Sequence, residues 1–204
     1  MARIDITDIR RRQIIDAAFK VFSEKGYHSA TMADIAAELE VGHGTLYRYF
    51  NSKLDIATSV IDDIITKITE IVADLPPGDI KTIEEYGERL DRIGSRFYEL
   101  LDENPEMHDF LFYDALSIDS TVTRKINAAF ELFGAYTEMY LKNGIDKGFL
   151  RDDIHTRETA FAINAMVFEA ARRIAAEKDP GEDLKTVWSQ TITGLILRGL
   201  GAGP

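Results

Sequence analysis

Apolar residues recur every three or four positions along almost the whole chain. This spacing places them on one face of an α-helix. No stretch shows the sustained alternation of apolar and polar residues, with β-branched enrichment, that is typical of strands. The sequence therefore predicts an all-α fold of about nine helices, and its 204 residues suffice for one or two domains.

Capping residues, glycines and prolines mark the ends of the predicted helices. Thr31 and Asp34 have the spacing of a capping box, as do Ser52 and Asp55. Pro76-Pro77-Gly78 interrupts the chain between two helical stretches. The expected helices cover roughly residues 8–25, 31–40, 45–50, 53–75, 82–103, 120–146, 156–177 and 182–199, with a short aromatic segment at 110–113.

The composition argues against catalysis by a metal or a covalent nucleophile. The chain has no cysteine, and its four histidines lack the spacing of metal ligands. No nucleophile-plus-base arrangement or phosphate loop is visible, so we expect no enzyme, cofactor, metal or catalytic residue. No apolar run reaches the ~18 residues of a membrane span. We expect a cytoplasmic protein without a membrane partner.

Charge is unevenly distributed along the chain. The net charge of −11 argues against a polyanionic partner, because phosphate affinity comes from Lys and Arg. However, residues 1–54 carry eight basic and seven acidic side chains, against sixteen and twenty-eight in the remainder. Either this is chance variation, or a weakly basic end that approaches a polyanion is joined to an acidic body.

Residues 31–50 have the pattern of a helix-turn-helix. A capped helix is followed by a turn with Gly42 and Gly44 and by a second helix that begins Thr45-Leu46-Tyr47-Arg48-Tyr49-Phe50. Leu46 and Phe50 are expected to face inward. Tyr47 and Tyr49 then remain outside beside Arg48, and these side chains donate hydrogen bonds to phosphates and base edges in a major groove.

These residues resemble the tetracycline-repressor (TetR) family of transcriptional regulators. The similarity extends over Ile14–Ala18, Phe22–Tyr27, Ala30–Ala36 and Gly44–Lys53, with a weaker echo at Gly144–Arg151. It implies a DNA-binding domain at residues 1–53 and a ligand-binding and dimerisation domain at 54–204. The DNA contacts that it suggests are Thr31, Thr45, Tyr47, Tyr49 and Lys53, with Lys53 on a phosphate. Further candidates are His43 and Gly44, where the turn meets the second helix, and the outward Arg48. Thr31 can also serve only as a helix cap, and His43 only as a solvated residue.

Two turn residues depart from the family pattern. Glu40 stands where the family usually has glycine, and Gly42 replaces a polar capping residue that often touches DNA. Glu40 facing a phosphate would repel it. We therefore expect either that Glu40 points away from DNA or that the affinity is below the family norm.

Aromatic residues and methionine concentrate between Phe97 and Phe168. Each one is more often a core residue than a ligand contact, but the resemblance implies a cavity among the fourth to eighth helices for a small apolar or aromatic effector. No cluster of Lys or Arg that would hold a sugar phosphate is visible in these stripes. The candidate ligand contacts are Phe97, Phe110, Tyr113, Asn127, Phe130, Asn164 and Phe168.

The last helix has an apolar stripe wide enough to pack on more than one neighbour. Small residues in the preceding helix permit close approach, so we expect a four-helix bundle between two copies of the chain. The candidate dimer contacts are Leu184, Val187, Trp188, Thr191 and Leu195.

The sequence thus favours a homodimeric repressor that binds double-stranded operator DNA and is controlled by a small ligand. An all-α enzyme acting on an apolar substrate lacks support from any catalytic motif. A protein–protein scaffold would leave Tyr47 and Tyr49 unexplained. The operator sequence, the identity of the effector and the direction of regulation stay open.

Overall fold

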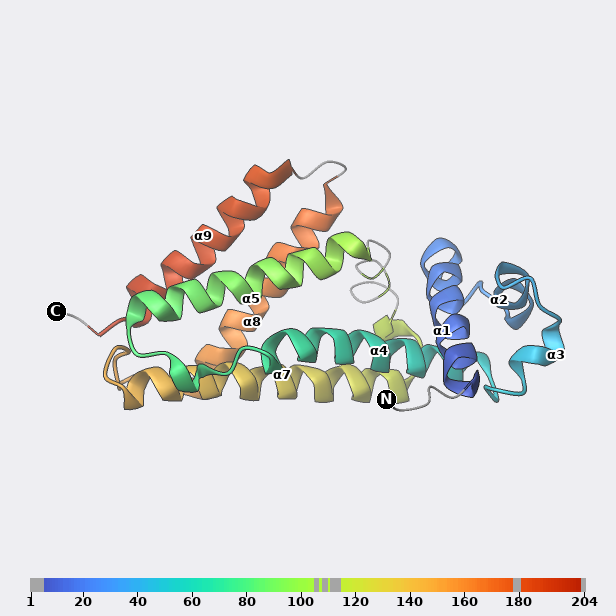
Figure 1. Cartoon of the computed structure of the whole chain (residues 1–204), viewed down its shortest axis with the longest axis horizontal. Helices are drawn as coiled ribbons and strands as arrows, with labels where there is room; N and C mark the ends of the chain where they lie inside the picture. The colour runs from blue at the N-terminus through green and yellow to red at the C-terminus, as the bar shows by residue number, and fades with distance from the viewer. Residues whose placement is uncertain (1–5, 105–106, 108–109, 111–114, 178–180, 203–204) are drawn as a thin grey trace. The chain divides into compact units, whose positions relative to one another are not determined.

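The computed structural model describes residues 6–104, 107, 110, 115–177 and 181–202, and this part of the chain is built from helices (Figure 1). The predicted all-α class is confirmed. The described residues form eight α-helices where about nine were expected, and most of the short segment expected at 110–113 lies outside them. The helices are α1 (Ile6–Lys25), α2 (Met32–Glu38), α3 (His43–Leu46), α4 (Lys53–Ala73), α5 (Ile83–Glu103), α7 (Ser120–Asp146), α8 (Thr156–Ala176) and α9 (Gly181–Leu200).

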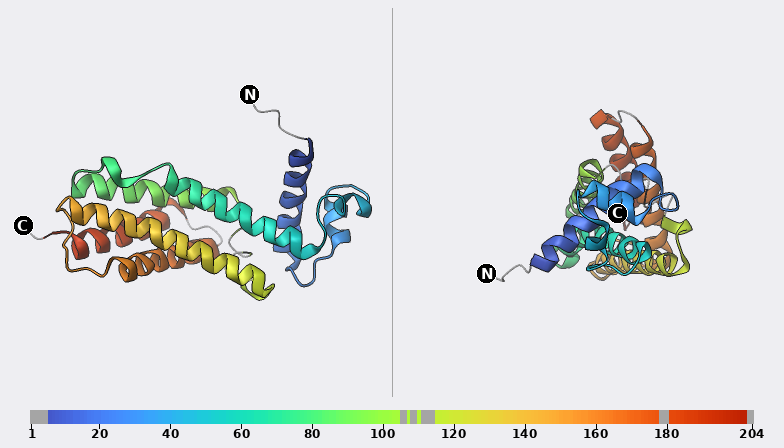
Figure 2. Two further views of the ribbon diagram at one scale, coloured as in Figure 1. Left: turned by 90° about the horizontal axis from the view of Figure 1, so that it is seen from below. Right: turned by 90° about the vertical axis from the view of Figure 1, so that its right-hand side faces the viewer.

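The chain forms two compact units that do not follow the expected boundary at residue 53. The amino-terminal unit contains Met1–Thr66 and Pro105–Asn127, and the carboxy-terminal unit contains Lys67–Asn104 and Ala128–Pro204. The long helices α4 and α7 are therefore shared, each contributing its amino-terminal part to the first unit. Within that unit Lys125 on α7 pairs with Asp62 on α4 at 2.6 Å, and the two helices run side by side in Figures 1 and 2.

The core of the amino-terminal unit is formed where α1, α2 and α3 meet. Ile14 and Phe22 of α1, Ile35 of α2 and Leu46 of α3 have no exposed surface. Phe110, from the segment before α7, is also fully buried and stacks on Phe22 with a centroid distance of 5.8 Å. Side chains from four separate segments thus hold this small unit together.

The capping box predicted at the start of α2 is confirmed. Asp34 N donates to Thr31 Oγ1 at 3.2 Å, and Thr31 N donates to the Asp34 carboxylate at 2.8 Å. Hydrogen bonds from Lys25 and from Thr31 lower the pKa of Asp34 to about 2. The second predicted box acts at the start of α4, where Asp55 N donates to Ser52 Oγ at 3.1 Å.

The carboxy-terminal unit is a bundle in which α5 packs against α8 and α9. Its core includes Tyr86 on α5, Leu141 on α7, and Ile192 and Ile196 on α9, all of them buried. Burial raises the pKa of Tyr86 well above its ordinary value. No helix among the described residues is long and apolar enough to cross a membrane.

Glu40, at the turn between α2 and α3, has a left-handed backbone with φ of 53°. The family pattern has glycine at this position, and only glycine reaches this conformation without a steric penalty from its side chain. The side chain of Glu40 is exposed, so no buried contact offsets the strain.

We expect Glu40→Gly to raise the free energy of unfolding by about 1 kcal/mol, because it relieves the left-handed strain. Chemical denaturation measures this change. Glu40→Ala is the matched control: it removes the carboxylate but keeps a Cβ, so it should give little of the gain. Equal stabilisation by both variants would assign the effect to charge and contradict the backbone explanation.

Candidate functional site

The second helix of the helix-turn-helix is shorter than the sequence predicts. An α-helix was expected to reach about Phe50, but α3 ends at Leu46 and a turn follows. At the C-cap Tyr47, ψ is −11°, and the next backbone bonds tighten, with Tyr49 N donating to Leu46 O at 2.9 Å. Such i→i+3 bonds mark a 3₁₀-like turn. The buried side chains of Leu46 and Phe50 both anchor this segment.

Burial of Leu46 and Phe50 leaves the remaining side chains of the segment on the outer side. His43, Gly44 and Arg48 are exposed, and half of the Tyr47 surface is accessible. The His43 ring lies edge-on to the Tyr47 ring at 5.2 Å. Thr31 is exposed at the start of α2, while Thr45 and Tyr49 are half-buried. The residues predicted to contact DNA at the start of α2 and in the recognition segment thus all keep accessible surface.

Lys53 is the first residue of α4, and its ammonium contacts the loop between α1 and α2. Its Nζ donates to Ala30 O at 2.6 Å, to Tyr27 O at 2.7 Å and, more weakly, to His28 O at 3.4 Å. The ammonium also lies 4.3 Å from the centre of the Tyr27 ring. Burial lowers the pKa of Lys53. The sequence pattern implies a phosphate contact for Lys53 and does not indicate these contacts with the loop.

Arginines of α1 also make internal contacts. Arg11 Nη1 donates to Tyr49 O at 2.6 Å, and its guanidinium stacks over the Phe50 ring at 4.2 Å. Arg12 pairs with Asp63 on α4. The carboxy-terminal end of the recognition segment is therefore fastened to α1.

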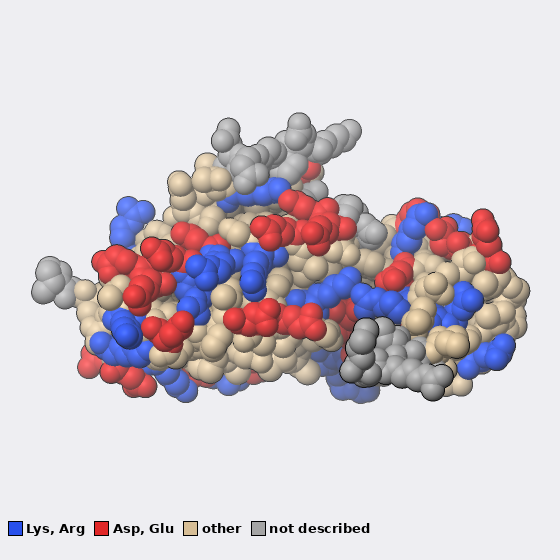
Figure 3. Space-filling model, viewed as in Figure 1, with Lys and Arg blue, Asp and Glu red and all other residues tan. Residues whose placement is uncertain are grey.

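Acidic side chains near α2 are paired with lysines of α1. Lys20 contacts Glu38 at 2.7 Å, and Lys25 contacts Asp34 at 2.6 Å. These pairs reduce the local repulsion that carboxylates would exert on a polyanion. Figure 3 shows acidic and basic side chains interspersed over one face of the molecule, without one dominant sign.

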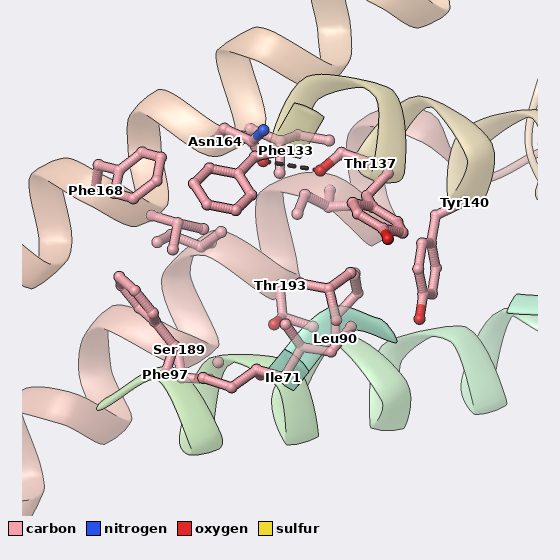
Figure 4. Close-up of a pocket in the computed structure, with 18 of the residues that line it drawn as sticks. Ile71, Leu90, Phe97, Phe133, Thr137, Tyr140, Asn164, Phe168, Ser189 and Thr193 are labelled. Atoms are coloured by element: carbon pink, nitrogen blue, oxygen red, sulfur yellow. Dashed lines mark hydrogen bonds between the residues drawn. The ribbon is translucent and has the colours of Figure 1, made fainter. Parts of the chain in front are cut away.

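The carboxy-terminal unit contains a cavity of about 140 Å³ (Figure 4). Most of its lining is aliphatic or aromatic, and none of the described lining residues is Lys or Arg. The walls come from α4, α5, α7, α8 and α9. They include Ile68, Ile71, Leu90, Ile93, Gly94, Phe97, Phe133, Thr137, Tyr140, Asn164, Phe168, Ser189, Ile192 and Thr193.

Few polar groups line this cavity. Thr137 Oγ1 donates to Asn164 Oδ1 at 2.8 Å, and the buried Asn164 Nδ2 has no hydrogen-bond partner among the described residues. Ser189 and Thr193 hydroxyls donate to Asp91 at 3.0 and 2.8 Å. An apolar wall with a few directional groups is typical of a small-molecule site.

The structure places three of the predicted ligand contacts, Phe97, Asn164 and Phe168, at this cavity. Phe130 lies edge-on to Phe168 at 5.3 Å but is 37% exposed and is not part of the lining.

The other predicted ligand contacts do not line the described cavity. Phe110 belongs to the core of the amino-terminal unit, because it packs on Phe19 and Phe22. Asn127 is exposed on α7, and Tyr113 lies outside the described residues. Sequence reasoning missed the contribution of α9 and, apart from Phe97, the lining residues of α5. The four-residue spacing of Ser189 and Thr193 within an apolar stripe was the available signal.

The outer face of α9 is apolar and accessible. Val187 and Leu195 are 56% and 57% exposed, and Thr191 lies exposed between them. Leu184 and Trp188 are half-buried, and Trp188 packs against the core of the unit. On the neighbouring α8, Ala162 and Ala165 are exposed. Two apolar faces on adjacent helices form a surface suited to a partner.

Comparison with known proteins supports the assignment of the amino-terminal unit. Residues 14–60 match the family model for bacterial regulatory proteins of the tetR family. The fatty acid metabolism regulator protein of Bacillus subtilis is 28% identical over 145 residues, which make up 71% of this chain and 73% of that protein.

Solved structures share the whole architecture. The transcriptional regulator FadR from Bacillus subtilis, crystallised in complex with stearoyl-CoA, has a TM-score of 0.77 at 25% identity, covering 92% of this chain and 98% of that one. FadR from Bacillus halodurans has a TM-score of 0.80 at 23% identity, covering 97% and 98%.

The helix-turn-helix and the matching family model define a DNA-binding transcriptional regulator. Residues 14–60 thus carry a DNA-binding domain of the TetR type.

We expect Tyr47→Ala to weaken operator binding by ~1–3 kcal/mol if the tyrosine reads a base, because the exposed ring and hydroxyl would both be lost. Tyr47→Phe isolates the hydroxyl and should cost about 0.5–1.5 kcal/mol. Gel shift with a duplex that the protein itself selects from a random-sequence pool measures both. Unaltered binding by a folded Tyr47→Ala variant would show that the assigned surface is wrong.

Proposed function

We propose that this protein is a homodimeric repressor whose operator binding is weakened by an apolar ligand in the cavity of the carboxy-terminal unit. The observation that carries the proposal is the continuity of α4. This helix begins at Lys53, directly after the recognition segment, and reaches the cavity wall at Ile68, Ile71 and Val72. A ligand that displaces this wall acts on the helix that also supports the DNA-binding unit.

The proposed DNA surface consists of the outward residues of the recognition segment and the start of α2. Its members combine hydroxyl, imidazole and guanidinium donors with the backbone N–H groups of helix ends, which are groups that contact phosphates and base edges. They are Thr31, His43, Gly44, Thr45, Tyr47, Arg48 and Tyr49. We also propose a cytoplasmic location, because a repressor has to reach its operator DNA.

The proposed ligand is neutral and mostly apolar, since the described lining offers aromatic and aliphatic walls without a basic group. A cavity of about 140 Å³ is close in size to one that holds a single benzene ring. A longer ligand, such as the acyl chain of the stearoyl-CoA bound to the Bacillus subtilis regulator, has to widen it. Widening separates the helices that form the walls, so such a ligand binds an altered conformation preferentially.

Two recognition helices enter successive major grooves only when they lie about 34–36 Å apart. We assign the dimer contact that sets this spacing to the exposed faces of α8 and α9, which would form a four-helix bundle with the same faces of a second copy. A ligand that favours a different spacing disfavours DNA. The ligand leaves chemically unchanged in this mechanism.

A filled cavity should make the repressor insensitive to its effector. Gly94 lies in the cavity wall, and a Cβ built on it meets no atom within 4 Å. We expect Gly94→Phe to occupy the cavity, to bind operator DNA like the wild type and to lose release by ligand. Apolar carbonyl compounds, fatty acyl thioesters and anionic metabolites are first screened by thermal shift, and each hit is then tested by gel shift.

Gly94→Ala is the control, because it should keep the response while stabilising α5 by up to about 1 kcal/mol. Stabilisation of the wild type only by anionic polar compounds would contradict the apolar site. Hits that never change operator affinity would contradict ligand control.

The dimer assignment predicts that Leu195→Glu is monomeric, because two carboxylates would be buried without partners in the interface. Sedimentation velocity at micromolar concentration measures the state. Leu116→Glu is matched in residue type and exposure, at 52%, but lies outside α8 and α9, so it should stay dimeric. A dimeric Leu195→Glu variant would exclude this face as the interface.

A further inference from the structure

Lys53 joins the two ends of the helix-turn-helix. It is the first residue of α4, just after the recognition segment, whereas its partners lie in the loop before α2. The loop carbonyls of Tyr27 and Ala30 accept from its Nζ at 2.7 and 2.6 Å, and that of His28 accepts at 3.4 Å. A lysine ammonium has three hydrogens to donate. These carbonyls therefore occupy its donor directions.

The loop needs this donor. Tyr27 and Ala30 are buried, with 8% and 1% exposure, and their carbonyls lie outside any helix, where a buried carbonyl has to find a partner. The Tyr27 ring, 4.3 Å below the ammonium, adds a cation–π contact. Burial, the hydrogen bonds and the cation–π contact all hold the Lys53 ammonium against the loop.

A second cation acts on the recognition segment itself, near its carboxy-terminal end. Arg11 of α1 donates to Tyr49 O at 2.6 Å. The position of α3 is thus set by Lys53 on the α1–α2 loop and by Arg11 on the final turn, in addition to the buried Leu46 and Phe50. Four residues of α3 are too few for a helix that is stable alone, so its orientation depends on such external contacts.

We propose that Lys53 is a positioning residue that closes the helix-turn-helix by binding the carbonyls of the α1–α2 loop, and that it supports DNA binding without contacting a phosphate. This inference rests on the proposed DNA surface and replaces the phosphate contact that the sequence resemblance implies. A phosphate oxygen would have to displace carbonyls at 2.6 and 2.7 Å to reach the ammonium.

The test compares Lys53→Met, Lys53→Arg and Arg48→Met on the selected duplex at several salt concentrations. Each lost phosphate contact lowers the slope of log Kd against log salt by about 0.9, and a substitution in a homodimer removes two contacts, so the slope falls by about 1.8. We expect Lys53→Met to weaken binding roughly tenfold, as for loss of one base contact, with the wild-type slope. Arg48→Met, on the exposed surface, serves as the reference for a direct phosphate contact.

Lys53→Arg keeps the charge but changes the geometry. A guanidinium fork suits a phosphate well, yet it cannot direct three donors at carbonyls that surround one point. We therefore expect Lys53→Arg also to lose affinity. If Lys53 instead contacts a phosphate, Lys53→Arg should bind DNA as well as the wild type does. This variant also keeps the test decisive if Lys53→Met does not fold.

Hydrogen exchange of the free protein provides a readout that does not involve DNA. Loss of the clamp should speed exchange in the peptide covering residues 26–39, whereas Arg48→Met should leave it unchanged. Wild-type exchange in Lys53→Met, or a slope reduced by about 1.8 together with full rescue by arginine, would overturn the proposal. Failure of the wild type to bind any duplex would instead overturn the proposed DNA surface, and the exchange measurement would still test the clamp.

Discussion

Burial of Leu46 and Phe50 against α1 and α2 is the contact on which the DNA-binding surface depends. Helix formation has a costly nucleus, and a segment of four residues gains too few hydrogen bonds to offset it. The position of α3 therefore depends on Leu46 at its end and on Phe50 four residues further on, which have 0% and 1% exposure. Because these positions face inward, Tyr47 and Arg48 face outward, and the same packing produces both stability and function.

Internal cations extend this arrangement. Both Arg11 and Lys53 act near the carboxy-terminal end of the recognition segment, Arg11 bound to the Tyr49 carbonyl and Lys53 to carbonyls of the loop before α2. Such contacts are charge-assisted and directional, so they restrict rotation of the segment in a way that apolar packing alone does not. A pre-organised surface loses less conformational freedom when DNA binds.

In the proposed function, the shared helices α4 and α7 couple ligand binding to DNA binding. Each helix has residues in both compact units, and a continuous helix transmits displacement because its backbone bonds resist bending. A ligand shifts DNA affinity only by its difference in affinity for the two conformations. In the proposed mechanism the small cavity supplies this difference, because a ligand larger than about one ring does not fit the narrow conformation.

Local patterns in the sequence were sufficient for the helical class, the capping box at Thr31 and Asp34 and the outward position of Tyr47, because these depend on residues close together in the chain. The likeness to TetR regulators also rested on consecutive residues. Only the tertiary structure decided that Phe110 belongs to the core under α1, that Ser189 and Thr193 line the cavity and that Lys53 binds the loop before α2. The Lys53 carbonyl contacts link residues 23 to 26 positions apart, and packing of separate segments, which periodicity does not encode, determines which side chains meet.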